Sequence, residues 1–351
     1  MRLTRGLVLV LGVLGAAALV AQIPPPAGKR SGPGVQSAAD EREPEVLKAC
    51  KTPPPARAGG PRRGGARAQE SGPRQYTVSE IPGVIAAGQQ WKEVWQVDGN
   101  NADGIIATKD GGLLIAQNDN SDVIKLDKDG KTSVAYSGTN TGGSMAMNAK
   151  GAIFVANRGL NPSIEELAPK RRTLANRYND DPMDCIGGVL NDIAADSKGG
   201  VYFTMGGLFY ADPKGKVTRY GENLTTNGIV LSADEKHVWV TNGPALAEFD
   251  VQKDGSLTNQ REFAKLGGNG DGSTFDSEGR LYVTTSAPGV QVIGPDGKDL
   301  GTIPTPRGVI SVAFSGPDRK TLYAVSRDNA QNKDWIIAIP MMAQGPKGRA
   351  K

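Results

Sequence analysis

A repeat of about 42 residues constrains the fold of this chain more than any other feature. Six short runs rich in β-formers each follow a polar turn, and their first residues lie 37 to 48 positions apart. The runs are Leu113-Leu-Ile-Ala-Gln, Ile153-Phe-Val-Ala-Asn, Val201-Tyr-Phe-Thr-Met, Val238-Trp-Val-Thr-Asn, Leu281-Tyr-Val-Thr-Thr and Leu322-Tyr-Ala-Val-Ser. A second family of Gly- and Asp-containing turns follows them, so each period holds two hairpins and four strands. The sequence predicts an all-β, six-bladed β-propeller of four-stranded blades.

The predicted propeller spans residues 76–342. Its ring closes if the alternating segment Trp91-Lys-Glu-Val-Trp-Gln-Val pairs with the strand near Trp335-Ile-Ile-Ala-Ile. Closure is favourable because it removes exposed strand edges. A solenoid has the same kind of period, but the paired Asp-Gly hairpins favour radial blades.

Three segments outside the propeller differ from it in composition. Residues 1–21 combine Arg2 and Arg5 with an apolar run from Leu7 to Val20, the pattern of a secretory signal peptide. Residues 22–75 are rich in Pro, Gly and Arg and are interpreted as a disordered linker. Residues 343–351 form a basic tail, which is expected to be flexible. An uncleaved N-terminal anchor is the alternative for the first segment, although the run is short for a bilayer span.

The basic residues are concentrated in these terminal segments. The whole chain has a formal net charge of +4, and the excess of Lys and Arg lies outside residues 76–342, so the propeller itself is acidic. A nucleic-acid-binding propeller is therefore not expected. The linker is interpreted as a solvated spacer, and a tail that contacts anionic polymers is the alternative.

The residue inventory excludes several classes of enzyme. The chain has one histidine, His237, and two cysteines, Cys50 and Cys185. A multi-histidine zinc or haem site is excluded, and a Ser/His/Asp triad would require His237, which lies in a polar hairpin turn. The two cysteines are able to pair in an oxidising compartment, but Cys50 lies in the predicted linker, so their pairing stays open.

The repeat register predicts a functional site. Innermost strands of a propeller line its channel, so residues at one register of successive repeats gather around the axis. Ten or eleven positions before each run stand Asp103, Gly143, Asn191, Asn227, Asp271 and Ser311. Four of the six are Asp or Asn, whose oxygens suit a hard divalent cation such as Ca²⁺. The alternative is that Asp-Gly and Asn-Gly are ordinary turn dipeptides.

These residues lie in motifs that resemble a known family. Leu190-Asn191-Asp192, Asn227-Gly228 and Asp271-Gly272 look like the PND, PNG and DG motifs of the SMP-30/gluconolactonase/LRE-like family. The closing Phe314-Ser-Gly-Pro-Asp-Arg-Lys-Thr-Leu-Tyr is similar to the last-blade signature of that family. Members are six-bladed propellers with one channel metal, and the characterised ones hydrolyse lactones of sugar acids or related esters.

The resemblance implies roles for individual residues. The metal ligands of the family fall on Asp103, Asn227 and Asp271, and its substrate-side asparagine falls on Asn191. Two positions depart from the family pattern. Asp103 replaces a glutamate, and Val189 stands where a sugar-contacting arginine is usual. The second departure argues against the usual aldonolactone pose.

The sequence thus predicts a gluconolactonase-like hydrolase that is exported to the periplasm or outside the cell. Its cofactor is expected to be one divalent cation, Ca²⁺ foremost, with Mg²⁺, Mn²⁺ and Zn²⁺ as alternatives. The metal would polarise the carbonyl of a small-molecule lactone, and Asp271 would activate water. A monomer with no nucleic-acid partner and no stable membrane anchor after signal cleavage is expected. The rival hypotheses are a non-catalytic propeller that binds a ligand or partner, and a strictosidine-synthase-like channel enzyme.

Overall fold

The computed structural model describes residues 42–52, 54, 72–287 and 289–351. The predicted signal peptide, residues 1–21, and most of the predicted linker lie outside the described residues. Within the part that is described, no helix combines the length and the apolar character that a bilayer crossing needs.

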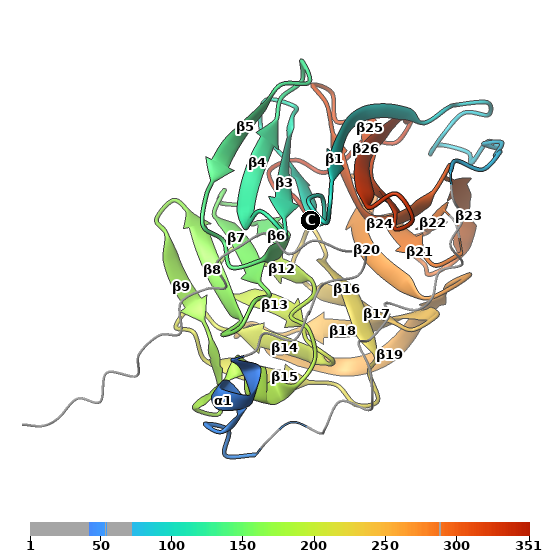
Figure 1. Cartoon of the computed structure of the whole chain (residues 1–351). Coiled ribbons are helices and arrows are strands. Elements are labelled where there is room, and N and C mark those ends of the chain that lie inside the picture. The colour runs from blue at the N-terminus through green and yellow to red at the C-terminus, as the bar shows by residue number, and fades with distance from the viewer. Residues whose placement is uncertain (1–41, 53, 55–71, 288) are drawn as a thin grey trace, which may run out of the picture.

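Six four-stranded antiparallel sheets form the blades of a propeller (Figure 1). Blade 1 holds β2 (Ile105–Ala107), β3 (Leu113–Gln117), β4 (Asp122–Leu126) and β5 (Thr132–Tyr136); blade 2 holds β6 (Gly142–Met147), β7 (Ile153–Asn157), β8 (Ser163–Ala168) and β9 (Arg172–Ala175); blade 3 holds β12 (Ile193–Ala195), β13 (Val201–Thr204), β14 (Leu208–Ala211) and β15 (Val217–Tyr220). Blade 4 holds β16 (Thr226–Leu231), β17 (His237–Asn242), β18 (Ala245–Val251) and β19 (Leu257–Lys265); blade 5 holds β20 (Gly270–Phe275), β21 (Leu281–Thr285), β22 (Gly289–Ile293) and β23 (Asp299–Pro304); blade 6 holds β24 (Gly308–Ser315), β25 (Thr321–Asp328), β26 (Lys333–Pro340) and β1 (Lys92–Asp98). The predicted fold class is confirmed.

The ring closes through the last blade. Strand β1, from the N-terminal side of the propeller, pairs antiparallel with β26, and Gln96 lies opposite Trp335. The innermost strands β2, β6, β12, β16, β20 and β24 contact one another in a closed circle around the channel. The pairing that the sequence predicts between the segment at Trp91 and the strand near Trp335 is confirmed.

The hairpin turns use one recurring hydrogen-bond pattern. In the β4–β5 turn, Asp127 Oδ1 accepts hydrogen bonds from the backbone N–H groups of Asp129 and Lys131, at 2.9 and 2.8 Å. Gly130 in this turn has φ of +81°, which glycine adopts at little cost. Asn148, Asp196, Asp212 and Asp276 accept the equivalent pair of bonds in other hairpins. The repeated Asp and Gly residues are therefore what ends each strand and reverses the chain.

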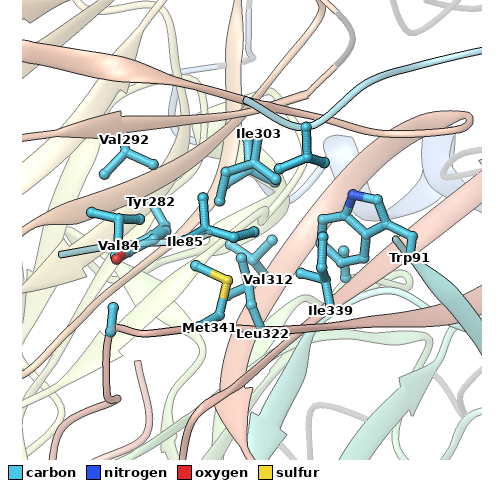
Figure 2. Close-up of a cluster of buried hydrophobic side chains, with 14 of the residues drawn as sticks. Val84, Ile85, Trp91, Tyr282, Val292, Ile303, Val312, Leu322, Ile339 and Met341 are labelled. Carbon is cyan, nitrogen blue, oxygen red and sulfur yellow. The ribbon is translucent and has the colours of Figure 1, made fainter. Parts of the chain in front are cut away.

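The hydrophobic core is divided into clusters between neighbouring blades. The cluster in Figure 2 joins blade 5, through Tyr282 and Ile303, to blade 6, through Leu322 and Ile339. Trp91 packs into the same cluster, and its indole N–H donates to the carbonyl oxygen of Pro304 at 2.8 Å. The chain that precedes β1 is thus held against the seam between these blades.

Part of the predicted linker is ordered against the propeller. Residues 43–47 form a short helix, α1 (Glu43–Leu47), and Cys50 is joined to Cys185 by a disulfide. Cys185 lies in a 3₁₀ turn, η1 (Met183–Ile186), which follows the small hairpin of β10 (Arg177–Tyr178) and β11 (Asp181–Pro182) between blades 2 and 3. The pairing that the sequence left open is present in the structure, and the expectation of disorder does not describe residues 42–52.

Replacing Cys185 by serine is expected to lower the free energy of unfolding by about 2 to 4 kcal/mol, because the disulfide restricts the unfolded chain. Cys50→Ser should have the same effect, and the double variant should be no less stable than either single one, since all three lack the same bond. Urea unfolding with a count of free thiols measures both points. Single variants as stable as the wild-type chain would contradict the prediction.

Candidate functional site

The predicted site residues lie where the inner strands begin. Asp103 precedes β2, Asn191 precedes β12, Asn227 is the second residue of β16, and Asp271 is the second residue of β20. Because the inner strands form a closed circle, these positions face one another at one end of the channel, which we call the site end.

Glycines at the neighbouring register allow adjacent inner strands to approach closely. A Cβ on Gly228 would lie 2.0 Å from the carbonyl oxygen of Asp271 on β20. A Cβ on Gly104 would lie 2.7 Å from the Cα atom of Ser144 on β6. Asn227-Gly228 and Asp271-Gly272 lie inside strands, so the alternative that they are ordinary turn dipeptides is wrong for these two pairs.

Arg158, which sequence analysis missed, joins two of the predicted site residues. Its Nη1 donates to Asp103 Oδ2 at 2.5 Å, and its Nη2 donates to Asn191 Oδ1 at 3.1 Å. Its Nε donates to the carbonyl oxygen of Leu190 at 2.9 Å. The arginine side chain is only 2% exposed. A Cβ on Gly143 would lie 2.0 Å from the Arg158 guanidinium carbon, so the arginine occupies the space that a side chain at position 143 would take.

Asp103 is held as a carboxylate between two arginines. Burial raises its pKa, but the charges of Arg158 and Arg327 and a 2.8 Å hydrogen bond from Asn118 Nδ2 outweigh burial and hold the pKa below the usual range. Arg327 comes from β25 and pairs with Asp334 at 2.7 Å. Asp334 Oδ2 in turn accepts from the backbone N–H groups of Asn101 and Ala102, at 3.0 and 2.9 Å. The loop that carries Asp103 is therefore fixed to blade 6.

Arg327 also links Asp103 electrostatically to Asp271. Burial lowers the pKa of Arg327, but the carboxylates of Asp334, Asp103 and Asp271 outweigh it, so the pKa lies above its ordinary value. A threonine at the end of β13 in blade 3 contacts the residue before Gly228. Thr204 Oγ1 donates to the carbonyl oxygen of Asn227 at 2.5 Å. The backbone N–H of Asp192, next to Asn191, donates to the same Thr204 hydroxyl oxygen at 3.1 Å. Hydrogen bonds thus join Asp103 to Asn191 through Arg158, and Asp192 to Asn227 through Thr204. The charge of Arg327 acts on both Asp103 and Asp271.

One buried oxygen atom of the site fits a divalent cation. Asn227 Oδ1 is buried and accepts no hydrogen bond from the residues that the structure describes, as expected of an oxygen that serves a ligand. Together with the carboxylates of Asp103 and Asp271 it gives an all-oxygen set that suits calcium. Asp103 is the exception, since it is paired with Arg158. Among the described residues, no group of three or more His, Cys, Asp or Glu side chains is placed to hold a metal ion.

Comparison with known proteins identifies the family. The family model described as the SMP-30/gluconolactonase/LRE-like region matches residues 132–328, more than half of the chain. The chain belongs to the SMP-30/gluconolactonase/LRE-like family. The resemblance read from the sequence motifs is confirmed, and the matched region contains Arg158, Asn191, Asn227, Asp271 and Arg327 but not Asp103.

One curated relative of this SMP-30 family chain is the lactonase drp35 of Staphylococcus saprophyticus. It is 28% identical over 260 residues, which are 66% of this chain and 74% of the relative. Other staphylococcal lactonases of the same name match over 57% to 59% of their own length. Lactonases are therefore among the homologues of this chain.

Two solved structures share the fold of this family member. The gluconolactonase XC5397 of Xanthomonas campestris superposes with a TM-score of 0.64 at 19% identity, covering 77% of this chain and 96% of that chain. The calcium-binding protein regucalcin of Agrobacterium tumefaciens superposes with a TM-score of 0.60 at 17% identity, covering 74% of this chain and 96% of that chain. At this identity the likeness shows the propeller fold alone.

Proposed function

We propose that this propeller is a lactonase-type carboxylic ester hydrolase whose active site is the site end of the channel. The observation that carries the proposal is the circle of Asp103, Asn191, Asn227 and Asp271 in a chain of this family. These side chains supply carboxylate and amide groups but no histidine or thiol. Lactone opening is the reaction of the named relatives that such a set supports without a nucleophilic side chain.

Asp271 is assigned the role of the general base. Its carboxylate would orient a water molecule and take its proton as the water oxygen attacks the lactone carbonyl carbon. Asn191 would hold the substrate by its side-chain amide, and the hydrogen bonds from Arg158 to its Oδ1 and carbonyl oxygen support that role by fixing its orientation. Neither asparagine transfers a proton.

One divalent cation, calcium foremost, would be held by Asp103, Asn227 and Asp271. When bound, such an ion supplies Lewis-acid stabilisation of the negative charge that develops on the lactone carbonyl oxygen. The orphaned oxygen of Asn227 supports this assignment. Asp103 would have to share its carboxylate between the ion and Arg158, or Arg158 would have to move away.

The ion pair between Arg158 and Asp103 favours a second candidate function, a propeller that binds a ligand without catalysis. A guanidinium at 2.5 Å already neutralises this carboxylate, and a cation would compete with it. In this case the metal is structural or absent. The absence of an arginine at position 189, where valine stands, points the same way for sugar lactones.

The full chain, assayed for metal content and for lactone hydrolysis by proton release before and after chelation, separates the two candidates. We expect one equivalent of divalent cation, loss of most of the turnover after chelation, and recovery on adding Ca²⁺. Mg²⁺, Mn²⁺ and Zn²⁺ added in parallel identify the preferred ion. A folded chain that binds none of these ions and turns over no lactone would move the assignment to the non-catalytic propeller.

We also propose that the protein is exported and acts as a monomer on a small-molecule lactone. The disulfide between Cys50 and Cys185 supports an oxidising compartment, since cytosolic thiols stay reduced in most organisms. Among the described residues, the large apolar side chains that are exposed, Val94, Val134, Leu300 and Met342, are isolated along the chain. Scattered exposed apolar residues of this kind are normal on the surface of a monomer.

A further inference from the structure

The segment of residues 345–351 enters the channel from the end opposite the site. Ala350 pairs with Met147, the last residue of the inner strand β6, through N–H to O contacts of 3.0 and 3.2 Å in the two directions. Arg349 Nη1 donates to the carbonyl oxygen of Ala195, the last residue of β12, at 3.1 Å. Its Nη2 also pairs with Glu235 in the first turn of blade 4. Figure 1 marks this end of the chain in the middle of the ring.

The last three residues of this segment are buried, although the sequence predicted a flexible tail. Arg349, Ala350 and Lys351 are each 6% exposed, whereas Lys347 and Gly348 are exposed. Ala350 packs in the cluster between blades 1 and 2. The segment therefore lies inside the propeller at this point, and its basic residues face carboxylates rather than solvent.

Lys351 reaches the carboxylate of Asp192, directly next to Asn191. Its Nζ pairs with Asp192 Oδ1 and lies 3.4 Å from Ser144 Oγ. Asp192 is 4% exposed and accepts hydrogen bonds from three blades. The donors are Ser144 Oγ at 2.5 Å, the N–H of Ile193 at 2.9 Å and the N–H of Ile229 at 2.8 Å. Ile229 is two residues beyond Asn227, so one carboxylate orients the backbone on both sides of the site.

We propose that Lys351 is a positioning residue for the site and that residues 345–351 close the far end of the channel. The catalytic part of this inference rests on the proposed lactonase function. Lys351 supplies the counter-charge of Asp192, and Asp192 holds the strands that carry Asn191 and Asn227. A buried carboxylate without a counter-charge is costly, so its hydrogen bonds and the strand ends that depend on them would rearrange if the lysine were lost. Substrate and water would enter at the site end.

Lysine acetylation of the folded full chain, followed by mass spectrometry, tests the insertion without any assay of activity. Lys347 is exposed and lies in the same segment, so it is a matched internal control. We expect Lys351 to react at least about ten times more slowly than Lys347, because it must leave the channel first. The substitution Asp192→Asn should make the acetylation rates of Lys351 and Lys347 more similar. Equal rates in the wild-type chain would overturn the proposal.

Kinetics of variants test the positioning role. Lys351→Met is expected to raise KM about tenfold with a smaller change in kcat, because Asn191 loses its fixed orientation. Lys351→Arg should restore most of the affinity, and Lys347→Met should behave as wild type. A protected Lys351 whose replacement by methionine leaves KM unchanged in an active enzyme would reduce the segment to a structural closure and overturn the positioning role.

A cycle of unfolding measurements keeps the inference separate from the proposed function. If the wild-type chain opens no lactone, the proposed function fails, but the pairing of Lys351 with Asp192 still predicts coupling. The double variant Asp192→Asn/Lys351→Met should then lower the midpoint of unfolding by less than the sum of the decreases in the two single variants. Additive losses would contradict the role of Lys351 as the counter-charge of Asp192.

Discussion

Replacing Asp271 by asparagine is expected to lower kcat for lactone hydrolysis by about 10²- to 10⁴-fold, the usual contribution of a positioned general base. Asparagine has nearly the same size, so β20 should keep its close approach to Gly228 on β16. What is lost is the group that accepts a proton and one negative charge at the site. Initial rates of proton release on a lactone panel, measured at saturating substrate, give the value.

Asp296→Asn is the matched control for this prediction. Asp296 lies in the β22–β23 turn of the same blade, is exposed, and pairs with Lys298 at 2.7 Å. The substitution should leave kcat unchanged, because Asp296 lies in an exposed turn away from the inner strand β20 that carries Asp271. If Asp271→Asn retains the turnover of the wild-type chain while folding normally, Asp271 is not the base.

Replacing Arg158 by methionine is expected to lower the free energy of unfolding by about 3 to 5 kcal/mol, as does removal of one partner from a buried ion pair. The side chains of Arg158 and Asp103 are 2% and 11% exposed, so solvent cannot compensate the carboxylate that remains. Arg327, whose charge also acts on Asp103, is already paired with Asp334. The same change removes the hydrogen bonds to Leu190 and Asn191. Urea unfolding of the two chains measures the difference.

The exposed pair of Lys125 and Asp110 gives the comparison. Their Nζ and Oδ2 atoms lie 2.5 Å apart, but the two side chains are 35% and 57% exposed. Lys125→Met should therefore cost no more than about 1 kcal/mol. A second check is Asp103→Asn combined with Arg158→Met, which should cost less than the sum of the single changes. An Arg158→Met chain that is as stable as Lys125→Met would show that the buried pair contributes nothing.

Arg158 stands at a second register of the same repeat, different from the register that predicted the site. Arg158 stands five residues after the start of its run, Ile153, and Asn118 and Arg327 stand five residues after Leu113 and Leu322. All three act on Asp103. Antiparallel pairing brings the end of each second strand beside the beginning of each inner strand, so this register and that of Asp103 reach the same end of the channel. The site prediction rested on the first of these two registers alone.

The disulfide and the buried tail were beyond sequence reasoning for a different reason. Composition describes residues 22–75 and 343–351 as polar, basic and rich in Gly and Pro, and such segments bury little apolar surface by themselves. Cys50 is nevertheless tied to Cys185, and Lys351 is paired with Asp192. The described residues around Cys50 and those around Lys351 gain their order from contacts with parts of the chain more than 100 residues away, which no local pattern contains.

The sequence by itself determined the period, the six blades, the ring closure and the four residues that begin the inner strands. It was able to do so because turn chemistry and strand alternation are local, and each repeat states them again. Tertiary structure alone decided which charges meet at the channel. Arg158, Arg327 and Lys351 come from blade 2, blade 6 and the last segment, and only folding brings them to Asp103 and Asp192. Electrostatic interactions depend on distance in space rather than on separation along the chain. These charges come within interaction distance only when the ring has closed.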